Sequence, residues 1–479
     1  MAFTSLHFIA FIAAAALLTS VLPTPAGRAA VLCGANLVFI GSYVDSVTEV
    51  APLAAFLLMC YLIIEGVRRS RSSAGLWLGL AVLILTFIVL KKFTFLSKSL
   101  VLPFPYLIAG LSYVLFRVLH LLIDAKQGEL AQPIAPLHFF NYTCNFLSFT
   151  AGPIQRYQDY ARNKDQALAL DEDKVFHAFA RVIKGFVKVA VVSAIFNYLF
   201  INMSGRLFDS AWTPSLPLYC GVYIATAVCY TVYLYANFAG YMDIVIGVGM
   251  LLGQELPENF NRPFLARSFL EFWQRWHMTL SEWFKTYVFN PLLKALATRF
   301  TSPASGPYLG VAAFFVTFLI MGVWHGTTSV FVVYGLLMGA GASVNKLWQV
   351  MMTKRLGKKG YRALAEQQLV IYFSRGLTLA YFTLALTCLW VDMPKQLWLT
   401  RQLGVFGVIG CYFGLALVAG AAFALWDALW SLLARLDLRA RLAASGMIGR
   451  NLTLAFQILL IVTVSSFFHK APEFVYRAF

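Results

Sequence analysis

Residues 306–324 read GPYLGVAAFFVTFLIMGVW, a run without a single charged side chain. An α-helix needs about 20 apolar residues to cross the roughly 30 Å hydrocarbon core of a bilayer. The run therefore predicts a helix that spans a membrane. It ends directly before His325, so the apolar segment leads into an ionisable side chain.

Similar apolar runs recur along the whole chain. Of its 479 residues, 60% are hydrophobic and 12% charged, and the mean hydropathy is +0.73, which is too apolar for an ordinary soluble globule. The runs are continuous and do not alternate with a period of two, so a transmembrane β-barrel is not expected. We predict an all-α, polytopic membrane helix bundle with about eleven transmembrane helices, and expect one or two candidates to be interfacial or re-entrant. The candidates are 4–22, 29–48, 50–67, 75–97, 100–123, 178–203, 217–236, 306–324, 327–345, 369–391, 401–426 and 452–468.

The net charge of +17, from 38 Lys and Arg against 21 Asp and Glu, is explained by the membrane and not by nucleic acid. Cytoplasmic loops of membrane proteins collect positive charge and contact lipid headgroups. We predict four basic clusters on the cytoplasmic side. They are Arg68, Arg69 and Arg71; Arg262, Arg267, Arg275, Lys285 and Lys294; Lys346, Lys354, Arg355, Lys358, Lys359 and Arg362; and Arg435, Arg439, Arg441 and Arg450.

The chain is expected to form one membrane domain over residues 1–479, because no internal repeat is evident. Residues 1–8 carry no Lys or Arg, and Pro23 and Pro25 follow without a convincing processing site, so the first run is expected to be a retained helix. The seven cysteines lack CxxC spacing. Neither a metal site nor a disulfide framework is therefore expected.

Residues 257–300 are rich in aromatic and basic side chains but poor in long apolar runs. Treated as a helix from about Ser268, the segment is amphipathic and predicted to lie along the membrane or dip into it. One face of this helix would be mainly aromatic. That face consists of Trp273, Trp276, His277, Leu280 and Phe284.

Two histidines are candidates for chemistry. His325 lies between long apolar segments and is flanked by Gly322 and Gly326, which allow close backbone approach. A neutral imidazole there can accept a proton from a hydroxyl near pH 7, as a general base must. The alternative is a packing histidine bonded to a carbonyl. For His277 the alternative is a side chain at the membrane surface.

Two charged residues lie in apolar stretches. Asp243 could orient a histidine or pair with an arginine, and a purely structural hydrogen bond is an equal alternative. Arg117 is a second candidate for burial, with Asp243 or Asp124 as structural partner. The chain has no GxSxG, P-loop, HExxH or GxGxxG motif. Acyl chemistry would therefore have to rest on histidine, with a covalent step on the enzyme as an open alternative, and no bound cofactor is expected.

The sequence NRPFLARSFLEFWQRWHMTLSEW at residues 261–283, followed by WHG at 324–326, resembles the membrane-bound O-acyltransferase family. Within the family it is most similar to the branch of the alginate O-acetyltransferase membrane subunit, with the teichoic-acid D-alanylation membrane protein as a near relative. The resemblance covers roughly residues 105–345. Further matching motifs lie at residues 110–113, 123–124, 151–157 and 238–243.

The resemblance implies a ring of helices around a central tunnel, with funnels from both sides meeting near the catalytic histidine. His325 matches that histidine and His277 the second functional one. The resemblance also implies a cytoplasmic acyl thioester donor, acetyl-CoA or an acyl carrier protein, and an acceptor on the opposite face. An extracytoplasmic partner protein would often deliver the group to polysaccharide.

We therefore predict an O-acetyltransferase for an extracytoplasmic polysaccharide, located in the bacterial inner membrane with membrane lipids around it. His325 would remove the hydroxyl proton, and His277 would orient or stabilise the developing oxyanion. The alternatives are D-alanyl transfer to a cell-envelope polymer, a polysaccharide or lipid transporter, and a non-catalytic scaffold. The predicted tunnel residues are Trp273, Trp276, Trp324, Asp243, Asn261 and Arg275.

Overall fold

The structure, a computed structural model, describes residues 5–94, 96–164, 171–435 and 446–468. Within these ranges every regular element is a helix and none is a strand, which confirms the all-α prediction. Nine of the described helices are long and apolar enough to cross a membrane. Two shorter apolar helices, His7–Val21 and Pro25–Gly41, account for the difference from the expected eleven. The chain is a polytopic membrane protein.

The run that opened the sequence argument forms helix α14 over the same residues, Gly306–Trp324. The predicted span 100–123 is wrong in its first half, because helix α5 begins only at Leu111. Pro103 and Pro105 lack the backbone N–H that a helix requires. Gly110 then turns the chain with a φ of +79° while the ring of Phe149 occupies the place of a Cβ, so only glycine fits there.

The described chain divides into two compact units. Unit 1 comprises the described residues up to Phe186 together with Phe238–Glu258, and unit 2 comprises Val187–Asn237 and the described residues from Asn259 onward. The division falls inside helix α10 (Leu216–Leu251). The expectation of a single membrane domain stays a prediction.

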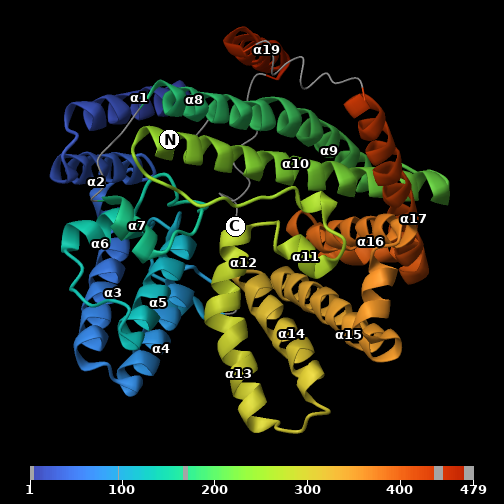
Figure 1. Ribbon diagram of the computed structural model, residues 1–479, viewed down its shortest axis with the longest axis horizontal. Coiled ribbons are helices and arrows are strands. Elements are labelled where there is room, and N and C mark those ends of the chain that lie inside the picture. The colour runs from blue at the N-terminus through green and yellow to red at the C-terminus, as the bar shows by residue number, and fades with distance from the viewer. Residues whose placement is uncertain (1–4, 95, 165–170, 436–445, 469–479) are drawn as a thin grey trace. The chain divides into compact units, whose positions relative to one another are not determined.

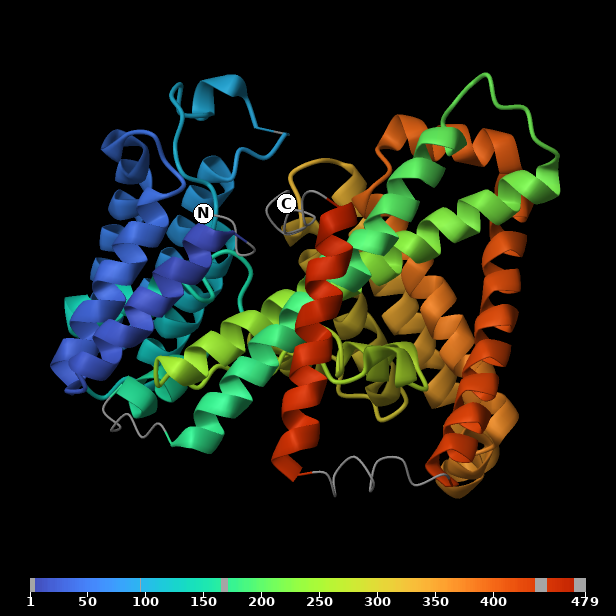
Figure 2. The same ribbon diagram turned by 90° about the horizontal axis from the view of Figure 1, so that it is seen from above.

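Unit 1 is built around helix α5, which is buried along most of its length. The helices α3, α4 and α5 contact one another and lie side by side in both views (Figures 1 and 2). The elements of unit 1 before α10 are α1 (Leu6–Val21), α2 (Pro25–Gly41), η1 (Val47–Val50), α3 (Ala51–Ser70), α4 (Ser73–Leu90), η2 (Lys98–Leu100), α5 (Leu111–Gln127), α6 (Pro136–Thr143), α7 (Tyr157–Lys164) and α8 (Glu172–Phe186).

Arg117 of α5 is 1% exposed and does not pair with a carboxylate as the sequence suggested. Its guanidinium donates to the carbonyl oxygens of Tyr142 at 3.2 Å, Thr143 at 2.7 Å and Ser148 at 2.6 Å. A fourth bond, of 2.7 Å, reaches the Ser148 hydroxyl. The planar guanidinium has five donors in a fixed fork, so one buried cation joins the last residues of α6 to the non-helical segment that follows.

Unit 2 contains the two candidate histidines. Its elements, apart from the first part of α10, are η3 (Val187–Ser193), α9 (Ala194–Leu207), η4 (Pro263–Leu265), α11 (Phe269–Trp273), α12 (Met278–Phe284), η5 (Lys285–Phe289), α13 (Asn290–Arg299), α14 (Gly306–Trp324), α15 (Val330–Ala365), α16 (Gln368–Leu386), η6 (Thr387–Leu389), α17 (Met393–Arg435) and α19 (Gly446–Phe467).

Helices α14 and α15 of unit 2 pack extensively against each other and form a hairpin (Figure 1). A Cβ on Gly322 would overlap the backbone of Gly335, and a Cβ on Gly339 would lie 2.8 Å from the carbonyl oxygen of Phe315. In a membrane, such close backbone contact replaces the hydrophobic effect as the source of helix association. The hairpin therefore fixes the end of α14, where His325 lies.

Candidate functional site

The predicted continuous helix from Ser268 is wrong, because the chain breaks between α11 and α12. Helix α11 ends at Trp273, and α12 begins only at Met278. His277 at the break has a φ of +44°, which is uncommon for any residue other than glycine. The Met278 N–H donates to the carbonyl oxygen of Asn259 at 2.9 Å. The Met278 N–H, which a continuous helix would bond internally, is thus bonded to a distant loop. The single aromatic face of a continuous helix therefore does not form.

The same loop holds the His277 ring. His277 and Asn259 are both 0% exposed, and His277 Nδ1 lies 3.2 Å from Asn259 Oδ1. That oxygen also accepts from the Thr279 N–H at 3.1 Å and from the Thr279 hydroxyl at 2.9 Å. His277 is therefore fixed by a hydrogen-bond cluster whose centre is one amide oxygen.

His277 is kept in its neutral form. Burial lowers the pKa of its ring well below the ordinary value, and the electrostatic interaction with His325 lowers that pKa further. A buried imidazole loses hydration when it is protonated, which is why burial favours the neutral ring. The effect of His325 also means that the two histidines lie within electrostatic reach of each other.

His325 follows the last turn of α14 and is 6% exposed. Its Nδ1 lies 2.8 Å from the carbonyl oxygen of Met321, and its backbone N–H donates to Gly322 at 3.1 Å. A carbonyl oxygen only accepts, so Nδ1 carries the hydrogen and Nε2 carries the basic lone pair. The carbonyl bond is the one expected of a packing histidine. It also prepares Nε2 to accept a proton.

Three of the predicted tunnel tryptophans lie in unit 2 with the histidines. Trp324 packs edge-on against His325, with ring centres 4.9 Å apart. Trp273 packs against Phe318 of α14 at 5.1 Å, which joins α11 to the helix that ends at His325. Trp276 lies 4.8 Å from Phe382. Trp324 thus places an aromatic ring directly beside His325, while Trp273 and Trp276 pack against phenylalanines.

The other predicted tunnel residues have different surroundings. The side chain of Asn261 is exposed, while its backbone N–H donates to Arg275 at 2.9 Å. Arg275 is bound to Glu271 at 2.8 Å. Their hydrogen bonds and ion pairs do not involve either histidine, so their place in a tunnel stays a prediction.

Asp243 belongs to unit 1 and pairs with an arginine, one of the alternatives that the sequence left open. Its carboxylate lies 3.3 Å from Arg181 Nε, and Arg181 also binds Glu258 at 2.6 Å. Lys184 lies 4.0 Å from the same carboxylate. The local role of Asp243 is therefore an ion-pair network on α8 and α10.

The sequence reasoning missed Asn259, Thr279 and Tyr334. The ring of Tyr334 lies 5.4 Å from that of His325 across the break between α14 and α15. Asn259 stands 18 positions before His277, and the chain between them passes through η4 and α11 with loops around them, so no single regular element relates the two residues. The only local signal for Asn259 was its place in a polar loop directly before the aromatic segment.

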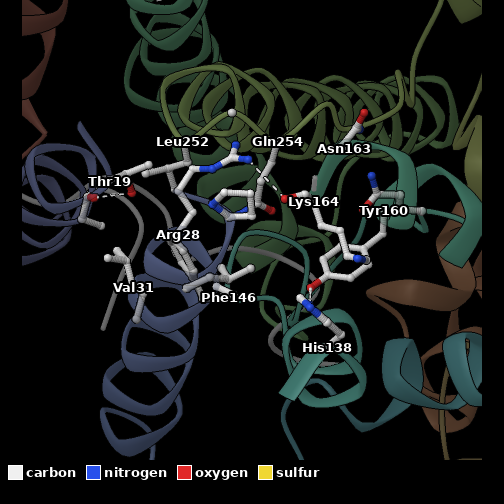
Figure 3. A pocket seen from close by; sticks show the side chains of 17 residues that line it. Thr19, Arg28, Val31, His138, Phe146, Tyr160, Asn163, Lys164, Leu252 and Gln254 are labelled. Atoms are coloured by element: carbon white, nitrogen blue, oxygen red, sulfur yellow. Dashed lines mark hydrogen bonds between the residues drawn. The ribbon is translucent and has the colours of Figure 1, made fainter. Parts of the chain in front are cut away.

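Unit 1 contains a cavity of about 50 Å³ whose lining includes none of these residues (Figure 3). Arg28 donates across it to the carbonyl oxygen of Lys164 at 3.1 Å, and His138 Nδ1 lies 3.3 Å from the Tyr160 hydroxyl. Pockets for small organic ligands usually measure about 300–1,000 Å³. The cavity has room for a water molecule or two and is too small for an acyl thioester.

The described helices define a polytopic membrane protein that buries two histidines, His277 and His325. The family profile described as "membrane-bound O-acyltransferase family" matches residues 52–372. The chain belongs to this family. Asn259, His277 and His325 all lie within the matched residues.

Three relatives illustrate the similarity. The chain is 31% identical over 237 residues to teichoic acid D-alanyltransferase of Bacillus subtilis, covering 47% of this chain and 56% of that protein. It is 28% identical over 302 residues to the enzyme of that name from Streptococcus thermophilus, covering 61% and 70%. It is 27% identical over 277 residues to the probable alginate O-acetylase AlgI of Pseudomonas fluorescens, covering 56% of this chain and 51% of that protein.

Proposed function

We propose that this protein is a membrane O-acyltransferase that passes an acetyl group from a cytoplasmic thioester to an extracytoplasmic polysaccharide, and that it resides in a bacterial inner membrane. The observation that carries the proposal is the buried pair of His277 and His325, each bonded through Nδ1 to an oxygen acceptor. Family membership and the similarity to an alginate O-acetylase support the reaction class and the acetyl group.

His325 acts as the general base of the proposed reaction. Its Nε2 takes the proton from the acceptor hydroxyl as the hydroxyl oxygen attacks the thioester carbonyl. The carbon–sulfur bond then breaks, and the proton passes to the sulfur leaving group, so that an ester and a free thiol are formed. General base catalysis of this kind contributes about 10²–10⁴-fold, and holding both substrates in one apolar site contributes further by proximity.

The donor is acetyl-CoA or an acyl carrier protein, and the basic loops supply attraction for the phosphate of the first or the acidic surface of the second. An extracytoplasmic partner or the polysaccharide itself receives the group. D-alanyl transfer is the second candidate, because two of the relatives described above are named teichoic acid D-alanyltransferases.

The test is acyl transfer by the full chain in proteoliposomes, with radiolabelled acetyl or D-alanyl thioesters of coenzyme A and of a carrier protein. Membrane extract supplies the acceptor. We expect His325→Ala to lower transfer by at least about 100-fold. The matched control is His177→Ala, which makes the same change at an exposed position of α8 and should leave transfer intact.

Transfer by the wild type that is lost only in His325→Ala supports the enzyme and the role of His325. Equal transfer by both variants overturns that role. If the wild-type protein transfers label from none of the four thioesters, the acyltransferase proposal itself is overturned. Which labelled thioester the wild-type protein uses decides between acetyl and D-alanyl transfer.

A further inference from the structure

The position of the proton on His277 can be read from the hydrogen bonds around Asn259. The Thr279 backbone N–H can only donate, and it lies 3.1 Å from one side-chain atom of Asn259. That atom must be the amide oxygen, which settles the orientation of the amide group. Because the amide oxygen only accepts, His277 Nδ1 at 3.2 Å must carry a hydrogen.

We propose that Asn259 is a positioning residue that holds neutral His277 with its hydrogen on Nδ1, so that His277 works in acyl transfer through a basic Nε2. This inference rests on the proposed function. It revises the expected role of His277 as an oxyanion donor, since the single N–H of the neutral ring is already bonded to Asn259.

The hydrogen bonds around Asn259 fix the orientation of its amide group and, through it, the tautomer of His277. Three donors converge on one oxygen, two of them from Thr279, and the Met278 N–H is bonded to the Asn259 backbone at 2.9 Å. Rotation of the amide would place its NH₂ against the Thr279 N–H and leave two donors facing each other. In a fully buried site such a mismatch costs about 1–3 kcal/mol, so the tautomer of His277 is strongly specified.

A second observation indicates that Asn259 borders a space for a ligand. Its Nδ2 is buried and has no acceptor among the residues that the structure describes. A buried N–H without a partner is unfavourable, and a bound molecule or water that accepts from it removes this cost. An amide that orients a histidine on one side and presents an unused donor on the other fits the wall of a reaction site.

The decisive variant is Asn259→Asp, which keeps an oxygen acceptor at the same place and adds a negative charge. An adjacent carboxylate stabilises the protonated imidazole and raises its pKa by about 1–3 units. The acid limb of the pH–activity profile should therefore move upward by about one to three pH units. The readout is the pH at which activity is lost on the acid side. The maximal activity is not used, because aspartate also lacks the Nδ2 donor and can change the maximum for that reason.

Two further variants complete the series. Asn259→Leu removes the acceptor, and we expect kcat to fall at least about 10-fold with a smaller change in KM, because the ring is no longer oriented. Asn202→Asp makes the same chemical change at an exposed position of α9 and should leave the pH profile in place. A loss of activity by the same factor at every pH in Asn259→Asp, with no movement of the acid limb, overturns the inference.

An independent measurement separates this inference from the acyltransferase proposal. Solid-state NMR of ¹⁵N-histidine-labelled full-length protein in lipid bilayers reports which ring nitrogen is protonated, and His277→Gln identifies the signals of His277. We expect the neutral ring with hydrogen on Nδ1 at pH 7.5 in the wild type, and titration at higher pH in Asn259→Asp. A hydrogen on Nε2, or a charged ring, overturns the inference whether or not acyl transfer is found.

Discussion

Replacing Gly322 with alanine tests whether the packing of α14 on α15 controls the position of His325. The added Cβ would overlap the backbone of Gly335. Carbon atoms in contact are normally about 3.5–4 Å apart, so the two helices would have to separate by roughly 1 Å or more. His325 would move with α14, because its Nδ1 and its backbone N–H are bonded to Met321 and Gly322.

The expected effects follow from that displacement. Overpacking costs about 1–3 kcal/mol, which for a unit of this size lowers the melting temperature by about 2–12 °C. A misplacement of about 1 Å at a reaction centre can reduce the rate about 100-fold. We therefore expect a folded but less stable protein in which kcat falls much more than KM rises, measured by thermal unfolding in detergent and by acyl transfer.

The matched control is Gly414→Ala in α17, where a Cβ would meet nothing within 4 Å. Alanine has the higher helix propensity by about 1 kcal/mol, so this variant should be as stable as the wild type or more stable, and fully active. The reasoning is refuted if Gly322→Ala matches the wild type in both melting temperature and activity. It is also refuted if the two alanine variants lose stability equally.

Two further predictions concern buried polar groups. Arg117→Met leaves the carbonyl oxygens of Tyr142, Thr143 and Ser148 without their donor. Each buried acceptor without a partner costs about 1–3 kcal/mol, so the free energy of unfolding should fall by at least that amount, whereas Arg206→Met at an exposed position of α9 should change it little. Equal melting curves for the two variants would contradict the bonding role. The pKa of His277 is lower in the folded protein than in the unfolded chain, so the unfolded state binds more protons below about pH 6.5. The free energy of unfolding is therefore not reduced by His277 above that pH, and falls by up to about 1.4 kcal/mol per pH unit below it. Between pH 7.5 and pH 5 the melting temperature of the wild type should fall more steeply than that of His277→Gln. Parallel curves of melting temperature against pH would argue against a buried neutral ring.

The composition of this chain determined its fold class and most of its spans. Because hydrocarbon offers no hydrogen-bond partners, a long apolar run must satisfy its backbone internally, and a helix is the way for a single segment to do so. This is why the run at 306–324 could be assigned to its residues from sequence alone. His325 was found for a similar reason, since an ionisable side chain next to such a run is conspicuous.

Only the tertiary structure decided the features that depend on hydrogen bonds between distant residues. The periodicity of residues 268–284 predicted one helix, but the loop at Asn259 bonds the chain at Met278 and the helix ends at Trp273. The partners of Arg117 were likewise carbonyl groups of a folded segment and not a carboxylate that composition could suggest.

Sequence patterns report the preferences of neighbouring residues, whereas the tautomer of His277 depends on an amide 18 positions away. The apolar pattern thus determined that the chain crosses a membrane and which segments do so. Only the folded chain determined which buried polar atoms form hydrogen bonds with one another, because the two partners lie far apart in the sequence and a local pattern does not relate them.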